Sequence, residues 1–327
     1  MVYNYDMNTK TILPKLQKNL KPGYKPSAVV AQAKAENKPL VALESTVITH
    51  GLPYPENLKL ARDMERVVAE NGAVGATIAL MGGEILVGLS DDQLETLAQA
   101  KKARKVSLRD FGVALARGEI GGTTVAATMF VAEQQGIRVF ATGGIGGVHR
   151  DAPFDVSTDL TQLGCCPVIV VCAGAKSILD IPATAEYLET QGVPVIGYQT
   201  DHFPAFFSRD SGLPLEIRAD SPEEVAEIAE AHWGLGLKSG ILVVVPVPEE
   251  HASPYEKMEA VIQQALAEAK ADGIMGNKMT PYLLAKVKEL SGGESLEANL
   301  ALLLNNARVA AQIAACLTPR PRPSHKL

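Results

Sequence analysis

Two ionisable side chains interrupt apolar runs of this sequence, in positions where a charge is costly unless it performs chemistry. Glu44 lies in VALEST, close to the end of an expected strand, and Lys176 follows the run VIVVCAGA and precedes SILD, where we expect a helix to begin. A carboxyl group in apolar surroundings keeps its proton and is a competent general acid. Apolar surroundings and the positive end of a helix both favour the neutral amine of a lysine, which is its nucleophilic form. The structural alternatives are a turn capped by Glu44 and a Lys176 side chain that extends into solvent.

The glycine-rich segment ATGGIGGVHR, residues 141–150, follows the expected strand IRVF. It lacks the dinucleotide-binding pattern, because His149 occupies the third glycine position and no acidic residue follows a second strand at the required spacing. The run GAKS at residues 174–177 lacks the adjacent Gly-Lys and the upstream glycine of a Walker loop. Glycines at a strand end expose N–H groups that suit an anion or a sugar, although a tight turn explains them equally well. We interpret His50 and His149 as ordinary loop residues.

Three aspartates follow the glycine loop at four-residue intervals. Asp151, Asp155 and Asp159 lie in RDAPFDVSTDL, and their oxygens suit Mg or Mn. A solvated helix start with an aspartate cap is the alternative. Upstream, Lys105 and Arg109 of RKVSLRD have the charge to pair with a phosphate, or form an ordinary exposed face.

The composition limits the class of protein. The chain has 327 residues, 46% hydrophobic and 21% charged, with a net charge of -6, and its one dense basic stretch, residues 101–105, holds four cations. Nucleic acid is therefore not an expected partner. Apolar runs stop well short of the roughly 20 residues of a membrane span, and we expect no membrane association, no secretory signal and a cytosolic location. The four cysteines are too few for a disulfide framework, and CCPVIVVC predicts a buried strand rather than a metal site.

Apolar strand-like runs alternate with amphipathic helical segments over most of the chain. One such helix is expected over residues 55–71, and another begins at Ser221-Pro222. The pattern predicts an α/β fold of three α/β/α layers with a central, mostly parallel or mixed sheet. From about Pro254 the pattern is helical, with candidates at 257–271, 280–290 and 295–317. We expect an N-terminal extension at 1–27, a single catalytic domain at 28–315 and a proline-rich tail at 316–327.

Longer motifs resemble one family over about residues 36–315. They are VALESTVITHGLPYPEN, KVSLRD, TTVAATM, FATGGIGGVHRDAPFDVSTDL, VVCAGAKSILD, YLETQGVPVIGYQTDHFPAFFSR and LLLNNARVAAQIA. They resemble the pseudouridine-5'-phosphate glycosidase family, which includes the indigoidine synthase A group. The resemblance implies a homotrimer, a divalent cation that is usually Mn2+, and reversible cleavage of pseudouridine 5'-phosphate to uracil and ribose 5-phosphate.

The resemblance also implies roles for individual residues. Lys176 matches the family's nucleophile, Glu44 its proton donor and Asp155 its metal ligand. The substrate-binding positions are Lys105, the amide region at Val125, Ser157, Thr158 and Asp159. In the implied mechanism Glu44 assists opening of the ribose ring, and Lys176 forms an iminium that lets the uracil carbon depart after protonation. The alternatives are a related lyase or synthase acting on another sugar phosphate, as in the indigoidine branch, and a non-catalytic binding protein.

Overall fold

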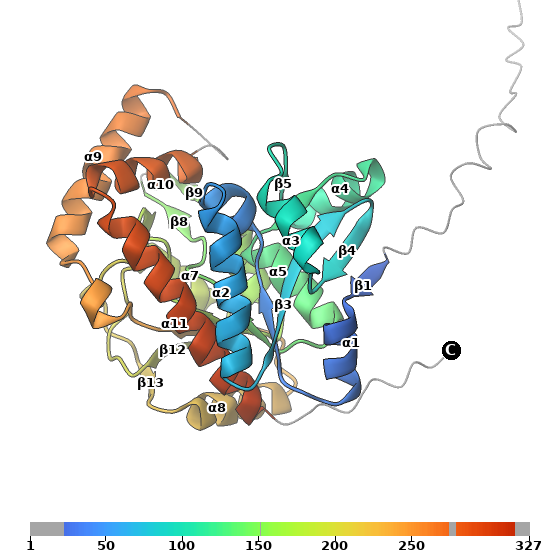
Figure 1. Cartoon of the computed structure of the whole chain (residues 1–327). Helices are drawn as coiled ribbons and strands as arrows, with labels where there is room; N and C mark the ends of the chain where they lie inside the picture. The colour runs from blue at the N-terminus through green and yellow to red at the C-terminus, as the bar shows by residue number, and fades with distance from the viewer. Residues whose placement is uncertain (1–22, 151, 275–278, 318–327) are drawn as a thin grey trace, which may run out of the picture.

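Single strands or groups of strands alternate with helices along the chain as far as β14, after which the described elements are all helices (Figure 1). The computed structural model describes residues 23–150, 152–274 and 279–317. The strands are β1 (Tyr24–Pro26), β2 (Leu40–Leu43), β3 (Val74–Met81), β4 (Glu84–Val87), β5 (Arg104–Val106), β6 (Gly121–Thr123), β7 (Val139–Ala141), β8 (Val148–His149), β9 (Ala152–Val156), β10 (Ile169–Cys172), β11 (Leu179–Asp180), β12 (Val195–Tyr198), β13 (Ile217–Ala219) and β14 (Ile241–Val244).

The helices include three short turns of π- or 3-10-helix, labelled η. They are α1 (Ala28–Ala35), η2 (Val47–Gly51), α2 (Glu56–Glu70), α3 (Asp91–Ala98), η3 (Leu108–Asp110), α4 (Phe111–Arg117), α5 (Val125–Gln134), α6 (Thr158–Leu163), α7 (Ile181–Thr190), α8 (Pro222–Gly234), η4 (Glu249–His251), α9 (Tyr255–Ala271), α10 (Met279–Leu290) and α11 (Glu294–Cys316). None of the helices in the described residues is long and apolar enough to cross a bilayer.

The main sheet of the described residues has 11 strands and is mixed. Its order is β1-β4-β3-β2-β7-β10-β14-β12-β13, with β6 paired to β3 and β5 paired to β6. The strands from β3 to β13 in this order are parallel to their neighbours, whereas β4 and β6 run antiparallel to β3. All four residues of β10 are buried, as expected for a strand covered on both faces.

Helices cover both faces of this sheet and confirm the predicted three layers. On one face α11 packs against β2, β7 and β10 and also contacts α2 and α8. On the other face α5 packs against β2 and β7 and also contacts α6. Figure 1 shows α11 and α5 on different sides of the sheet. The predicted helices at 55–71 and after Ser221 are present as α2 and α8, and Ser221 accepts the N–H of Glu224 as the N-cap. The helical C-terminal third is also confirmed, as α9, α10 and α11.

A second, three-stranded antiparallel sheet, in the order β11-β8-β9, was not predicted. Two of its strands have only two residues, too few for a hydrophobic alternation to be visible in the sequence. This sheet corrects one expectation. The residues after Lys176 form a turn and then β11, and α7 begins only at Ile181, where the Asp180 side chain caps the N–H of Ala183. The prediction that a helix begins at SILD was wrong, so no positive helix end adjoins Lys176.

The chain ends lie largely outside the described residues. Of the expected N-terminal extension, Tyr24–Pro26 form β1, which pairs in parallel with β4 at the edge of the main sheet. Of the expected tail, Cys316 is the last residue of α11. Residues 1–22 and 318–327 are not among those described.

Candidate active site

Glu44 and Lys176 follow strands that are two positions apart in the sheet, and the glycine loop follows the strand between them. Leu43 of β2 pairs with Ala141 of β7, and Ala141 pairs with Val171 of β10. The three strands are parallel, so the segments that follow them emerge at the same edge. In the sheet, β2 lies between β3, the next strand in the sequence, and β7, a later one, so the strand order reverses at β2. Ligands in open α/β sheets bind at the carboxyl ends of the strands where such a reversal occurs.

The carboxyl group of Glu44 is half-buried at this edge, where a threonine holds it. The Thr142 hydroxyl donates a hydrogen bond to Oε1 of Glu44. Burial raises the pKa of Glu44, while the positive charge of Lys176 and the Thr142 hydroxyl act in the opposite direction. The raised pKa favours a protonated carboxyl, which is the form that a general acid requires.

The loop that carries Lys176 is fixed by the glycine loop beside it. The N–H of Lys176 donates to the carbonyl of Ile145 (3.1 Å), and the N–H of Ile145 donates to the carbonyl of Gly174 (3.0 Å). Gly174 has φ +88°, and a Cβ at this position would lie 2.7 Å from Cε1 of Phe203. Only glycine allows this backbone approach, so the position of Lys176 depends on it.

Asp159 is buried, with both carboxylate oxygens bonded to backbone amides. Oδ1 accepts the N–H of Ala126 in the first turn of α5 (2.9 Å), and Oδ2 accepts the N–H of Gly146 in the glycine loop (2.8 Å). The residues expected beside it differ in exposure. Ser157 is the N-cap of α6 and accepts the N–H of Asp159, whereas Thr158 is exposed. Asp159 therefore joins the glycine loop to the start of α5.

Lys105 and Val125 reach this region from two further elements, β5 and the start of α5. Lys105 lies on β5, paired with Gly122 of β6, and Val125 begins α5 immediately after β6. The N–H of Val125 belongs to the first helical turn and has no acceptor within the helix. Lys105 is exposed at the surface, and partial desolvation by the protein around it lowers its pKa. Lys176 acts in the same direction, and Asp159 and Glu44 oppose both effects. The four charged groups of the predicted site are thus close enough to influence one another.

Buried hydroxyl groups tie the turn after Glu44 to the strand before Val125. Ser45 Oγ donates to the carbonyl of Ile78 (2.5 Å) and accepts the N–H of Thr123 (2.9 Å). Thr46 Oγ1 donates to the carbonyl of Thr123 (2.7 Å). Each of these bonds joins residues far apart in the sequence, so the hydroxyls fix the ends of β2 and β6 relative to each other.

Of the three aspartates considered for a metal, the two that the structure describes, Asp155 and Asp159, do not share a site. Asp155 is exposed on β9, Asp159 is bonded to two amides, and Asp151 lies outside the described residues. Within the described residues, no three His, Cys, Asp or Glu side chains are close enough to share a metal ion. One exposed carboxylate does fit a Mg or Mn ion that keeps most of its water ligands.

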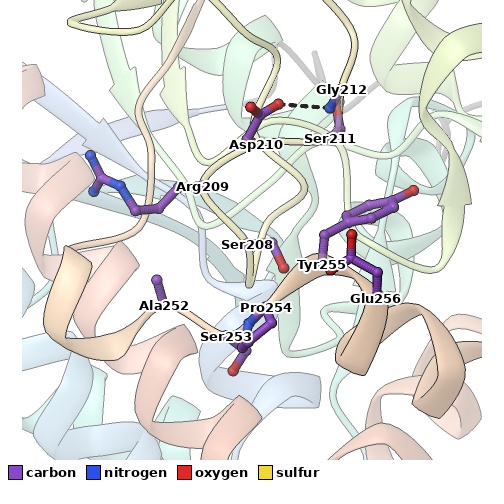
Figure 2. Close-up of a pocket in the computed structure, with 10 residues that line it drawn as sticks. All are labelled: Ser208, Arg209, Asp210, Ser211, Gly212, Ala252, Ser253, Pro254, Tyr255 and Glu256. Atoms are coloured by element: carbon purple, nitrogen blue, oxygen red, sulfur yellow. Dashed lines mark hydrogen bonds between the residues drawn. The ribbon is translucent and has the colours of Figure 1, made fainter.

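Two surface pockets lie away from these residues. The larger, about 620 Å³, lies between the loop at 208–212 and the segment at 252–256 (Figure 2). Figure 2 shows Asp210 accepting the N–H of Gly212 there. The second, about 510 Å³, lies between the start of α7 and α9. None of the predicted site residues lines either pocket, so neither defines the candidate site.

Sequence reasoning missed a residue that bonds to Glu44 and a second residue that bonds to the first. One is Thr142, considered only as part of the glycine loop. The other is Asn306, a buried amide on α11 whose Nδ2 donates to the carbonyl of Thr142 (2.8 Å). Its signal was a polar residue within the apolar stripe of LLLNNARVAA, where a buried amide needs a specific partner.

Known proteins are similar to this chain over most of its length. The family model described as indigoidine synthase A like protein matches residues 29–316. A pseudouridine-5'-phosphate glycosidase of Cupriavidus pinatubonensis is 54% identical over 298 residues, which cover 90% of this chain and 95% of that protein. Another, from Solibacter usitatus, is 55% identical over 287 residues, covering 87% and 96% of the two chains.

Solved structures resemble the whole described fold. An indigoidine synthase A-like protein of Thermotoga maritima has a TM-score of 0.82 at 37% identity, and 90% of this chain and 96% of that chain are covered. The prealnumycin C-glycosynthase AlnA, solved in complex with ribulose 5-phosphate, has a TM-score of 0.84 at 44% identity with the same coverage. Because the family model matches residues 29–316 and relatives more than half identical cover about 90% of the chain, this chain belongs to the indigoidine synthase A-like family.

Proposed function

We propose that this protein cleaves the carbon–carbon glycosidic bond of pseudouridine 5'-phosphate, giving uracil and ribose 5-phosphate. The observation that carries the proposal is the convergence of Glu44, with its raised pKa, and Lys176 at the carboxyl edge of β2, β7 and β10. The relatives that are more than half identical to this chain bear the name of this activity.

The chemistry requires an acid and an amine. Protonating a leaving oxygen or nitrogen, as other glycosidases do, cannot release a carbon-bound base. Instead, Glu44 protonates the ring oxygen as its bond to C1' breaks, and the Lys176 amine bonds to C1'. The resulting Glu44 carboxylate takes the proton that the attached nitrogen must lose and delivers it to C5 of uracil. The freed nitrogen lone pair then forms an iminium at C1' as the C1'–C5 bond breaks and its electrons return to the uracil ring. Water then hydrolyses the iminium, releasing ribose 5-phosphate and the free amine.

Other groups of the site hold the substrate. Lys105 and the first-turn N–H of Val125 supply a cationic side chain and an N–H donor suited to the 5'-phosphate. The next two amides of this turn already donate to Asp159 and Thr124. Asp155 would hold a hydrated Mn2+ or Mg2+, which supplies ordered water ligands and positive charge near the substrate. The family resemblance further supports a homotrimer and a cytosolic location, and light scattering coupled to size-exclusion chromatography tests the first.

A related synthase or lyase on another sugar phosphate is the second candidate. The observation that favours it is the structural likeness to AlnA, which was solved with ribulose 5-phosphate. In that reaction the same lysine and acid would join a carbon nucleophile to the sugar phosphate instead of cleaving the bond.

The deciding experiment measures uracil release from pseudouridine 5'-phosphate by chromatography. We expect turnover by the wild type and by Lys25→Ala, a surface lysine paired with Glu84, but none by Lys176→Ala. Pseudouridine without its phosphate should have a much lower kcat/KM than pseudouridine 5'-phosphate. Lys105→Ala should narrow this difference, because it lowers kcat/KM for the phosphorylated compound only. No uracil release by the wild type would reject the glycosidase, and ligand binding without any turnover would identify a binding protein.

A further inference from the structure

A pair of side chains outside the predicted catalytic set connects α11 to the carboxyl group of Glu44. Thr142 is completely buried, as is Asn306. Asn306 Nδ2 donates to the Thr142 carbonyl at 2.8 Å and lies 3.5 Å from the Gly143 carbonyl. The Thr142 hydroxyl in turn donates to Oε1 of Glu44. The contacts therefore run from a helix on one face of the sheet to the acid at its edge.

We propose that Thr142 and Asn306 are positioning residues that together set the orientation and protonation of Glu44. This inference rests on the proposed function, since it assigns residues that prepare the acid of that reaction.

The direction of the hydrogen bond determines its chemical effect. A hydroxyl that donates to a carboxylate stabilises the ionised form, so the Thr142 hydroxyl opposes the rise in the pKa of Glu44 that burial causes. The other charged groups that act on Glu44 are Lys176 after β10, Asp159 on α6 and Lys105 on β5. The two lysines favour the carboxylate and Asp159 disfavours it. Thr142 is the contributor that bonds directly to the carboxyl oxygen.

Asn306 determines where the Thr142 hydroxyl can lie. The N–H of Thr142 donates to Val171 of β10 (3.0 Å), so its amide and its carbonyl are each held by a different element. Oδ1 of Asn306 is buried without a hydrogen-bond partner in the described part of the chain. A buried acceptor left unpaired is costly, and an apolar residue would avoid that cost. The amide therefore serves its donor contact with Thr142 rather than the packing of α11.

The chain contains a matched control for this contact. Thr77 is also a buried threonine, and its hydroxyl donates to Oε1 of Glu65 (2.5 Å). Burial raises the pKa of Glu65 as it does that of Glu44. Neither Thr77 nor Glu65 belongs to the candidate site. Thr77→Val thus removes the same kind of hydrogen bond from the same sheet without touching Glu44.

The test follows the Glu44 carboxyl directly. Protein carrying carbon-13 glutamate is titrated by infrared spectroscopy, and the Glu44 band is identified as the one lost in Glu44→Gln. We expect Thr142→Val to move its titration to higher pH by about one unit, and Thr142→Ser to restore it. Asn306→Ala should cause a smaller shift in the same direction, and no further shift when combined with Thr142→Val. Thr77→Val should leave the Glu44 band unchanged.

Kinetics provide the second readout. If Glu44 acts as an acid, activity falls as pH rises through its pKa. In Thr142→Val the alkaline limb of the kcat/KM profile should therefore move to higher pH, by the same amount as the infrared titration. A merely structural contact would lower activity equally at every pH. Wild-type titration of Glu44 in Thr142→Val, or an Asn306→Ala shift that persists fully in the double variant, would overturn the proposal. Because the infrared titration needs no substrate, its outcome is separate from that of the uracil assay.

Discussion

Replacing Asp159 with asparagine tests whether this residue joins the glycine loop to α5. The carboxylate accepts one N–H from Ala126 and one from Gly146, at 2.9 and 2.8 Å, and it is only 6% exposed. Asparagine keeps one acceptor oxygen and places an NH2 group against the other backbone N–H. The variant loses one bond to a charged group, worth about 1.5–3 kcal/mol, and weakens the second to a neutral bond. We expect the free energy of unfolding to fall by about 2–4 kcal/mol.

Urea unfolding followed by circular dichroism measures this change, with Asp155→Asn as the control. Asp155 lies four residues earlier and is exposed, so its variant should remain within about 0.5 kcal/mol of the wild type. Asp159→Asn should also lower kcat/KM, because Gly146 and the start of α5 lose their common anchor. Equal stability of the two variants would refute the inference that Asp159 holds these two amides together.

Glu44→Gln should keep its fold and lose turnover by about 100-fold to 10,000-fold, because an amide cannot deliver the proton; near wild-type turnover would exclude the acid. Borohydride reduction with ribose 5-phosphate should add one pentose phosphate to the peptide containing Lys176, and an adduct on a different lysine would contradict the assignment. Chelation should abolish activity, with Mn2+ restoring the wild type but not Asp155→Ala, whereas full activity in excess chelator would remove the metal from the mechanism. Arg150 pairs with both oxygens of Glu259 and donates to the carbonyls of Ser177 and Leu179, next to Lys176. A lysine cannot make all of these contacts, so Arg150→Lys should lower kcat by a larger factor than it alters KM. An unchanged kcat would show that these contacts do not position Lys176.

Glu44 and Lys176 could be selected from the sequence because their types conflict with their surroundings. Glu44 and Lys176 are ionisable groups in apolar runs, and the same runs predicted strands that are covered on both faces. Parallel strands then bring the residues after them to one edge. The sheet order that makes β2, β7 and β10 neighbours is not visible in any local pattern, because it depends on packing across the whole domain.

The hydrogen bonds that join Glu44, Thr142 and Asn306 could not be predicted from the sequence either, because they also depend on packing across the domain. Thr142 and Glu44 are 98 residues apart, and Asn306 and Thr142 are 164 residues apart. Asp159 was expected to bind substrate or a cation, yet its oxygens accept two backbone N–H groups, a contact that depends on where α5 begins relative to the glycine loop. The prediction of a helix directly after Lys176 was wrong because α7 begins only at Ile181, with Asp180 as its N-cap and Pro182 in its first turn. Leu179 and Asp180 before it pair with β8 instead.

The charges of the site explain how substrate binding can favour the acid form of Glu44. Burial raises the pKa of Glu44 and favours the protonated carboxyl that the proposed reaction requires. The positive charge of Lys176 works against this rise, and the charge of Lys105 does so to a smaller extent. If Lys105 binds the 5'-phosphate as proposed, the dianion offsets that positive charge and removes its effect on Glu44. Substrate binding would then itself promote the protonated acid, which gives a physical reason for a phosphate so far from the bond that is cleaved.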